Sequence, residues 1–172
     1  SAPATQFPFA DSSLVDPVSG VTDGLLDNAR ATQSQPKVMY TNTGVEYWSS
    51  SGRAAALTHT TPDGSRDLAF PDNVRSYLLS GAQHSPGAFP PVQGLGQQPG
   101  NPLDYWWTLR ALLVAMDGWV REGVAPPASQ YPMLDRGTLV DSARVAFPSI
   151  PGVQSPREIR SAAPRSEEHT SE

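Results

Sequence analysis

The chain of 172 residues contains no cysteine. Disulfide cross-links and zinc sites with cysteine ligands are therefore excluded. Lysine is almost absent too, because Lys37 is the only lysine and the other basic residues are arginines scattered along the chain. With 12 basic and 17 acidic residues, the net charge is −5. A nucleic-acid-binding protein needs a concentrated basic surface, so the sequence predicts no nucleic-acid partner.

Long apolar runs are missing as well. A membrane-spanning helix needs about 20 consecutive apolar residues, and charged residues, Pro or Gly interrupt every run well before that length. We therefore expect no membrane span. Turn-forming residues are abundant instead, with 18 Pro and 14 Gly. Leu, Ile, Val and Phe together make up about a fifth of the chain, near the lower limit for a packed domain. The composition predicts a loop-rich domain.

The last eight residues, RSEEHTSE at 165–172, correspond to the translation of a widely used DNA-sequencing adapter. We therefore expect residues 165–172 to be read-through rather than native sequence, and residues 1–164 to be part of a single domain. The tail holds one basic and three acidic residues, so the net charge without it is −3. His169 is accordingly no candidate for chemistry. The excess of Arg over Lys and the start at Ser1 predict a fragment of a GC-rich bacterial gene.

Two short apolar runs predict neighbouring β-strands. Residues 38–41 (VMYT) and 73–79 (NVRSYLL) are β-prone and are bounded by turn formers. Between them, residues 46–57 predict a helical segment loosened around 49–52 (SSSG), and residues 61–64 (TPDG) predict a turn. Two strands joined through a helix indicate a right-handed parallel crossover. The predicted fold class is therefore α/β, with parallel strands and flanking helices.

Two further helices are expected. The shorter covers residues 25–31, with Asp23 as its N-cap. The longer has Asn101 as N-cap and Pro102 in its first helical position, and it stops at Gly123. Its apolar residues form a broad stripe that we expect to pack on the sheet. The stripe consists of Leu103, Trp106, Trp107, Leu109, Leu112, Leu113, Met116, Trp119 and Val120.

Candidate catalytic side chains follow the two predicted strands. Catalytic groups in open α/β sheets gather at the carboxyl ends of the strands. Glu46 follows the first strand and His84 follows the second, so neighbouring strands would bring both side chains together. An imidazole there can take a proton from a nucleophile and return it to a leaving group, while a carboxylate on its other nitrogen fixes the tautomer. Asp67 and Asp104 are the alternative candidates for the acid.

The nucleophile that would complete this pair is missing from the chain. Acid followed by histidine is the order of the last two members of a triad whose serine comes first, on a G-x-S-x-G turn. No G-x-S-x-G occurs in the sequence. Ser85, beside His84, is unsuitable because the serine of such a triad follows a different, earlier strand. We therefore expect the serine to lie upstream of this chain.

The sequence also permits a non-catalytic interpretation. Residues 85–101 form a long Pro- and Gly-rich loop that would suit an interaction module or a degenerate relative of an enzyme. Glycines interrupt the prolines, however, and this disfavours a sustained polyproline helix. No cofactor is predicted. The three histidines lack H-E-x-x-H spacing, so no metal site is predicted, and His59 is expected to be structural or exposed.

Several motifs resemble one family over residues 7–153. They are YTNT at 40–43, EYW at 46–48, THT at 58–60, PDNVR at 71–75, GAQH at 81–84 and NPLDY at 101–105. Together they resemble the C-terminal part of a bacterial family of esterase-like alpha/beta hydrolase domain proteins. The resemblance implies the C-terminal part of an α/β-hydrolase fold, with Glu46 and His84 at the acid and histidine positions and a small-molecule ester as substrate. Ala82 and Gly44 stand where the family is expected to have Thr and Ser. Because the nucleophile region of the family is absent, the chain alone is expected to be inactive.

Overall fold

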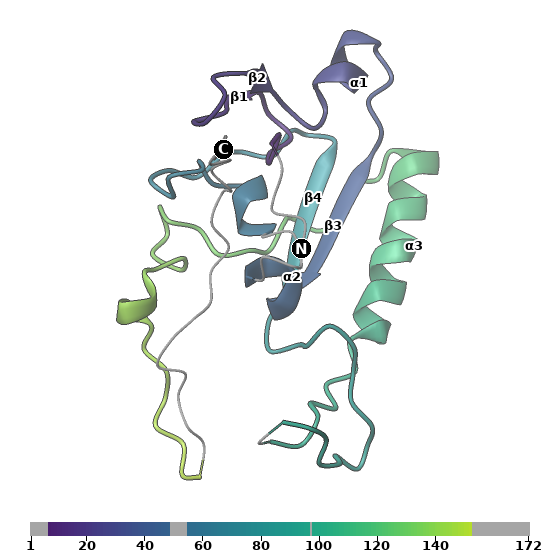
Figure 1. Cartoon of the computed structure of the whole chain (residues 1–172). Helices are drawn as coiled ribbons and strands as arrows, with labels where there is room; N and C mark the ends of the chain where they lie inside the picture. The colour runs from purple at the N-terminus through teal and green to yellow at the C-terminus, as the bar shows by residue number, and fades with distance from the viewer. Residues whose placement is uncertain (1–6, 49–54, 97, 153–172) are drawn as a thin grey trace, which may run out of the picture.

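The computed structural model describes residues 7–48, 55–96 and 98–152 (Figure 1). The predicted read-through tail at 165–172 lies outside the described residues. The elements follow one another along the chain as β1 Leu14–Val15, β2 Thr22–Asp23, α1 Asp27–Ala31, β3 Val38–Thr43, α2 Gly44–Trp48, the 3₁₀ turn η1 Ala55–Thr58, β4 Val74–Leu79, α3 Trp106–Glu122 and the 3₁₀ turn η2 Ser142–Arg144.

Strands β3 and β4 pair in parallel, as the sequence predicted. Their register runs from Val38 opposite Val74 to Thr43 opposite Leu79. β3 extends two residues beyond the predicted 38–41, because the polar Asn42 and Thr43 continue the ladder beside Leu78 and Leu79. The fold class is therefore α/β, as predicted. The short strands β1 and β2 form a separate antiparallel hairpin.

The connection between β3 and β4 was predicted in part. Helix α2 begins at Gly44, directly after β3 and two residues before the predicted start, and η1 covers Ala55–Thr58. The predicted loosening at 49–52 lies outside the described residues. The turn at 61–64 is confirmed, because the backbone N–H of Gly64 donates to the carbonyl of Thr61 at 2.8 Å and Gly64 has φ +66°. The crossover therefore contains two short helical pieces in its described part.

Both predicted N-caps are wrong. Helix α1 begins at Asp27 with Leu26 before it, and Asp23 Oδ1 instead accepts the N–H of Gly24 at 2.8 Å. Residues 102–105 are not helical, because the Asn101 side chain makes an Asx turn in which Oδ1 accepts the N–H of Leu103 at 3.0 Å. Its Nδ2 donates to the carbonyl of Gly81 at 2.6 Å, which ties Asn101 to the end of β4.

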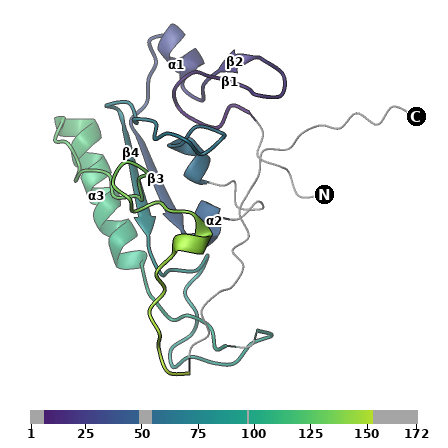
Figure 2. The same ribbon diagram turned by 90° about the vertical axis from the view of Figure 1, so that its left-hand side faces the viewer.

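Helix α3 begins at Trp106 and ends as predicted. The carboxylate of Asp104 accepts the N–H of Trp106 at 3.0 Å at its start. Gly123 terminates it with φ +73°, the left-handed conformation that glycine adopts without steric cost. Figures 1 and 2 show α3 on one side of the β3–β4 pair and α2 on the other.

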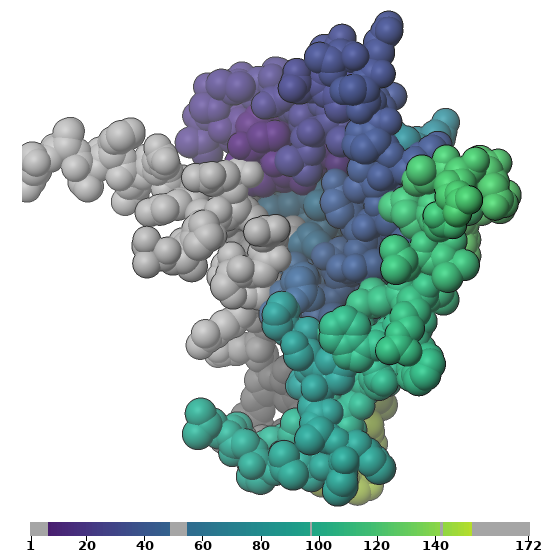
Figure 3. All heavy atoms as spheres, turned by 90° about the vertical axis from the view of Figure 1, so that its right-hand side faces the viewer, coloured from purple at the N-terminus to yellow at the C-terminus, as the bar shows by residue number. Residues whose placement is uncertain are grey.

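Within the part of the chain that the structure describes, only one edge of the predicted apolar stripe of α3 is packed. Leu112 and Trp119 are buried. Lys37 and Arg75 lie over the Trp119 ring, with the Lys37 Nζ 4.6 Å and the Arg75 guanidinium carbon 5.1 Å from its centroid. Trp107 is 69% exposed, and Figure 3 shows the outer face of α3 along this side of the molecule. The stripe spans more of the helix circumference than two strands can cover. Its other exposed members are Leu103, Trp106, Leu113 and Val120.

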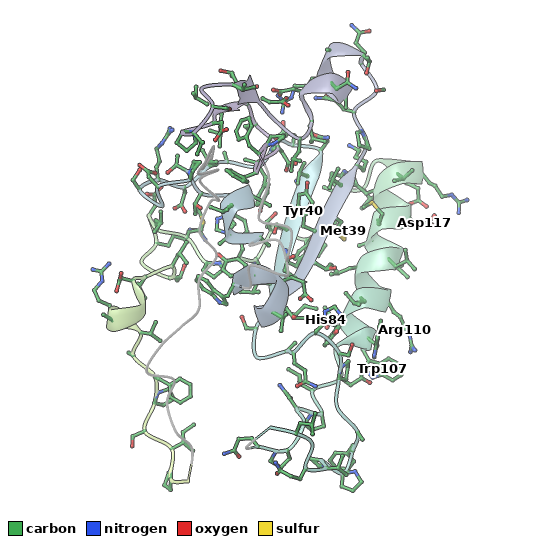
Figure 4. The ribbon with its side chains drawn as sticks, in the orientation of Figure 1. Met39, Tyr40, His84, Trp107, Arg110 and Asp117 are labelled. Atoms are coloured by element: carbon green, nitrogen blue, oxygen red, sulfur yellow. The ribbon has the colours of Figure 1, made fainter. Side chains whose placement is uncertain are left out.

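The opposite face of the sheet carries an aromatic cluster. Met39 and Tyr40 point to opposite sides of β3, with Met39 on the α3 side (Figure 4). The Tyr40 ring lies 6.1 Å from the Phe70 ring, which packs edge-on against Tyr131 at 5.2 Å. His59 packs within this group, with its ring tilted against that of Tyr131 and the two centroids 4.6 Å apart. This cluster fixes the crossover segment against the strands. No helix in the described part of the chain is long and apolar enough to cross a membrane.

Candidate active site

The ends of β3 and β4 bring Glu46 and His84 into direct contact. Glu46 lies in α2, which starts immediately after β3, and His84 lies in the loop after β4. The start of α2 is joined to this loop by a hydrogen bond from the N–H of Gly44 to the carbonyl of Ala82 at 3.3 Å. Glu46 Oε1 is 2.5 Å from His84 Nδ1. Parallel pairing with matching strand ends is the reason that two residues 38 positions apart meet here.

Glu46 is also held from the side of β3. Its Oε2 accepts the backbone N–H of Thr43 at 2.8 Å and the Thr43 hydroxyl. The side chain of Glu46 is 25% exposed. Burial raises the pKa of Glu46, but the hydrogen bonds from Thr43 and His84 favour the charged form more strongly and lower the pKa to about 2. The carboxylate is therefore ionised throughout the neutral range.

An ionised carboxylate on Nδ1 determines the protonation of the imidazole. A carboxylate only accepts hydrogen bonds, so Nδ1 must carry the proton when it faces Glu46. In the neutral ring, Nε2 then holds a free lone pair. The His84 side chain is 77% exposed, and no hydrogen bond from the described residues reaches its Nε2. The geometry therefore leaves Nε2 of His84 facing the outside of the described structure.

The backbone around His84 is fixed by the segment before α3. The Tyr105 hydroxyl donates to the carbonyl of His84 at 2.5 Å. Gln83 Nε2 donates to the carbonyl of Ser85 at 2.6 Å, and its Oε1 accepts the N–H of Asn101 at 3.4 Å. Figure 4 shows His84 beyond the ends of the strands, at the level of the first turns of α3. The imidazole is exposed, but the backbone that carries it is anchored.

The Pro- and Gly-rich loop leaves and rejoins the structure beside this anchor. The N–H of Gly87 donates to the carbonyl of Asn101 at 2.6 Å. A Cβ at Gly87 would lie 3.0 Å from that oxygen and from the carbonyl carbon of Gly100, so a side chain there would require the other end of the loop to shift by a few tenths of an ångström. The Pro- and Gly-rich loop at 85–101 is therefore closed at its base next to His84.

The alternative acids have other roles. Asp67 accepts the N–H groups of Leu134 at 3.0 Å and Asp135 at 2.9 Å, and this fixes the segment after α3. Asp104 accepts the N–H of Trp106 at the start of α3. Neither carboxylate contacts His84 in the described structure, and Glu46 does.

His59 is buried rather than exposed and belongs to the aromatic cluster. His59 is 1% exposed, and its Nε2 lies 2.8 Å from the hydroxyl oxygen of Tyr47. Burial lowers the pKa of His59, which favours the neutral ring. Its Nδ1 has no hydrogen-bond partner in the described structure. His59 therefore contacts α2 through Tyr47, and it does not contact the Glu46–His84 pair.

The described residues contain no cluster of three or more His, Asp or Glu side chains that could hold a metal ion. A surface hollow of about 450 Å³ lies elsewhere, between residues 67–75 and 128–135. Neither Glu46 nor His84 lines this hollow.

The sequence interpretation missed Thr43 and Tyr105 as supports of the pair. The signal for Thr43 was present, because Thr43-Gly44-Val45-Glu46 has the T-x-x-E spacing of a capping box at a helix start. No sequence pattern marks Tyr105, because its contact with His84 depends on the path that the chain takes after the 85–101 loop.

A parallel crossover with a carboxylate–imidazole pair at the ends of its strands, acid first and histidine second, is typical of α/β hydrolases. A family model described as "Alpha/beta hydrolase domain" matches residues 5–148. The chain belongs to this alpha/beta hydrolase domain family, which agrees at the family level with the resemblance found in its motifs. No curated protein and no solved structure matches the chain.

Proposed function

We propose that this domain supplies the acid, Glu46, and the general base, His84, of a serine hydrolase that acts on carboxylic esters. The observation that carries the proposal is the 2.5 Å contact between Glu46 Oε1 and His84 Nδ1, with the His84 side chain 77% exposed. In the intact protein, the serine comes from a segment that precedes Ser1.

In this mechanism, His84 Nε2 takes the proton of the serine hydroxyl while the serine oxygen attacks the ester carbonyl. Glu46 stabilises the imidazolium that forms but does not take the proton itself. The imidazolium then gives the proton to the leaving alkoxide, which departs as the alcohol. Water repeats the sequence on the acyl-enzyme: His84 takes its proton, the carboxylic acid leaves and the serine hydroxyl is restored.

Two features of the fold support a partner segment on the α3 side. In the described part of the chain, β3 pairs with β4 alone, although parallel sheets are normally larger and covered on both faces. The outer face of α3 exposes apolar side chains, including Trp107 and Val114.

We propose that residues 1–164 are the C-terminal portion of one hydrolase domain and that residues 165–172 are not native.

The test is a steady-state assay of the intact protein with a broad panel of activated esters. His84→Ala should lower kcat by roughly 10⁴- to 10⁶-fold, because a triad acts as a unit. Glu46→Gln should lose less, because water or a neighbouring group can partly orient the imidazole. Asp104→Asn is the matched control, since it removes a carboxylate near the same loop but keeps an oxygen that can accept the Trp106 N–H.

Full hydrolysis by His84→Ala would show that the histidine is structural. If Asp104→Asn lost as much activity as Glu46→Gln, the assignment of the acid would be wrong. If the intact wild-type protein hydrolysed no ester, the non-catalytic interaction module would become the preferred function.

A further inference from the structure

Thr43 and Glu46 form a helix cap that differs from the usual capping box. In that box, the N-cap hydroxyl accepts an N–H from the first turn, and the glutamate three residues later accepts the N–H of the N-cap residue. The second half is present here, because the N–H of Thr43 donates to Glu46 Oε2 at 2.8 Å. The first half is weak, since the N–H of Val45 is 3.4 Å from the Thr43 hydroxyl.

The Thr43 hydroxyl donates to the carboxylate instead. Its proton goes to Glu46 Oε2, the same oxygen that accepts the Thr43 N–H. Both donors of one residue therefore hold one oxygen, and Oε1 is left to face His84 Nδ1. Thr43 is 5% exposed, so water has little access to replace its hydroxyl.

We propose that Thr43 is a positioning residue, whose two hydrogen bonds to Glu46 Oε2 aim Oε1 at His84 and thereby hold the imidazole proton on Nδ1. Its catalytic importance rests on the function proposed above, whereas the positioning itself concerns only these three side chains.

The geometry explains why Glu46 needs such a support. A glutamate side chain has three rotatable bonds, and fixing them costs conformational entropy. The imidazole that Glu46 must orient is 77% exposed and offers little packing to hold the pair together. Thr43 lies at the last position of β3, in register with Leu79 of β4. Because the backbone of Thr43 is held in the sheet, its hydrogen bonds to Glu46 restrict the movement of the carboxylate.

The hydrogen bonds of Thr43 also affect the charge of the acid. The Thr43 hydroxyl and N–H are among the groups that lower the pKa of Glu46. An ionised acid that is already aimed at Nδ1 excludes the other neutral tautomer, in which Nε2 would carry the proton and could not act as a base.

The first experiment measures the tautomer of His84 in the intact protein by ¹⁵N NMR, at a pH where the ring is neutral. Thr43→Val keeps the branched shape and the backbone N–H but loses the hydroxyl. Thr43→Ser keeps the hydroxyl. Thr41→Val is the matched control, because it makes the same change on the same strand at an exposed position.

The wild type, Thr43→Ser and Thr41→Val should show the Nδ1–H form of His84. Thr43→Val should shift the population toward the Nε2–H form. An unchanged His84 spectrum in Thr43→Val would overturn the proposal, and so would an equal change in all three variants, because the hydroxyl would then not be the cause.

The second experiment separates this inference from the proposed function. In the intact hydrolase, Thr43→Val should lower kcat by up to about 100-fold with KM unchanged, and Thr43→Ser should restore it. If the tautomer changes as expected but the intact wild type hydrolyses no ester, the positioning role stands and the proposed function fails. If ester hydrolysis is present but Thr43→Val equals Thr41→Val in both experiments, the positioning role fails and the proposed function stands.

Discussion

The hydroxyl of Tyr105 donates a hydrogen bond to the backbone carbonyl of His84 at 2.5 Å. This contact links the residue before α3 to the residues directly after β4, although the Pro- and Gly-rich loop separates them in the sequence. Tyr105 is 9% exposed, so the hydrogen bond is shielded from water. The position of the histidine backbone therefore depends on the docking of α3 as well as on the sheet.

Tyr105→Phe should loosen the loop that carries His84. The loss of one shielded hydrogen bond should lower the free energy of unfolding by about 1 kcal/mol, measured by urea denaturation. Amide hydrogen exchange around His84 should become faster. Tyr77→Phe is the matched control, because it removes a similar hydrogen bond to the carbonyl of Pro127. Equal exchange around His84 in both variants would contradict an anchoring role for Tyr105.

The stability of the protein should decrease in acid through Glu46. Its pKa is about 2 in the folded protein and 4.5 in an unperturbed chain. As the pH falls below 4.5, the unfolded state binds a proton first, so the stabilisation present above pH 4.5 is lost progressively as the pH approaches 2. Urea denaturation at a series of pH values should show a smaller decrease for Glu46→Gln. A wild-type slope in that variant would argue against the lowered pKa.

A second dependence on pH should arise from His59. Burial beside Tyr47 and Tyr131 lowers the pKa of His59 below 6.5, the value of an unperturbed ring, although the charge of Asp67 acts in the opposite direction. The unfolded state binds a proton below pH 6.5 before the folded state does, so stability should fall as the pH decreases through this value and toward the folded pKa.

His59→Phe should remove this component, because a neutral ring of similar shape cannot titrate. Tyr47→Phe keeps His59 and should keep the decrease. The measurement is the free energy of unfolding between neutral and mildly acidic pH. Identical slopes in His59→Phe and wild type would show that another group is responsible.

The two edges of α3 should respond differently to truncation. Trp119 is 4% exposed and contacts Lys37 and Arg75, whereas Trp107 is 69% exposed. Trp119→Ala should lower the free energy of unfolding by about 3–5 kcal/mol, since it leaves a cavity. In the 172-residue chain alone, where no further segment covers the outer face of α3, Trp107→Ala should change it by no more than about 0.5 kcal/mol. Similar losses in urea denaturation would mean that Trp107 is also packed in solution.

Local patterns in the sequence determined the strands, their parallel pairing and the end of α3. The apolar runs at 38–41 and 73–79 are short, β-prone and bounded by turn formers, which favours strands, and the segment between them is long enough for a crossover. The left-handed conformation at Gly123 is a local property of glycine. The contact between Glu46 and His84 could be predicted because strand ends in a parallel sheet meet at one edge.

Tertiary structure alone decided which side chains support that pair and which face of α3 is covered. The apolar stripe of α3 has no local feature that separates Trp119 from Trp107, because burial depends on where β3 and β4 lie relative to the helix. Asn101 is a residue type that is common at helix N-caps. Its side chain instead donates to the carbonyl of Gly81, just after β4, and holds the end of the loop there. Thr43 is part of a local T-x-x-E pattern, yet the direction of its hydroxyl depends on a carboxylate that His84 also holds. Contacts between distant segments set these outcomes, and no local pattern encodes their geometry.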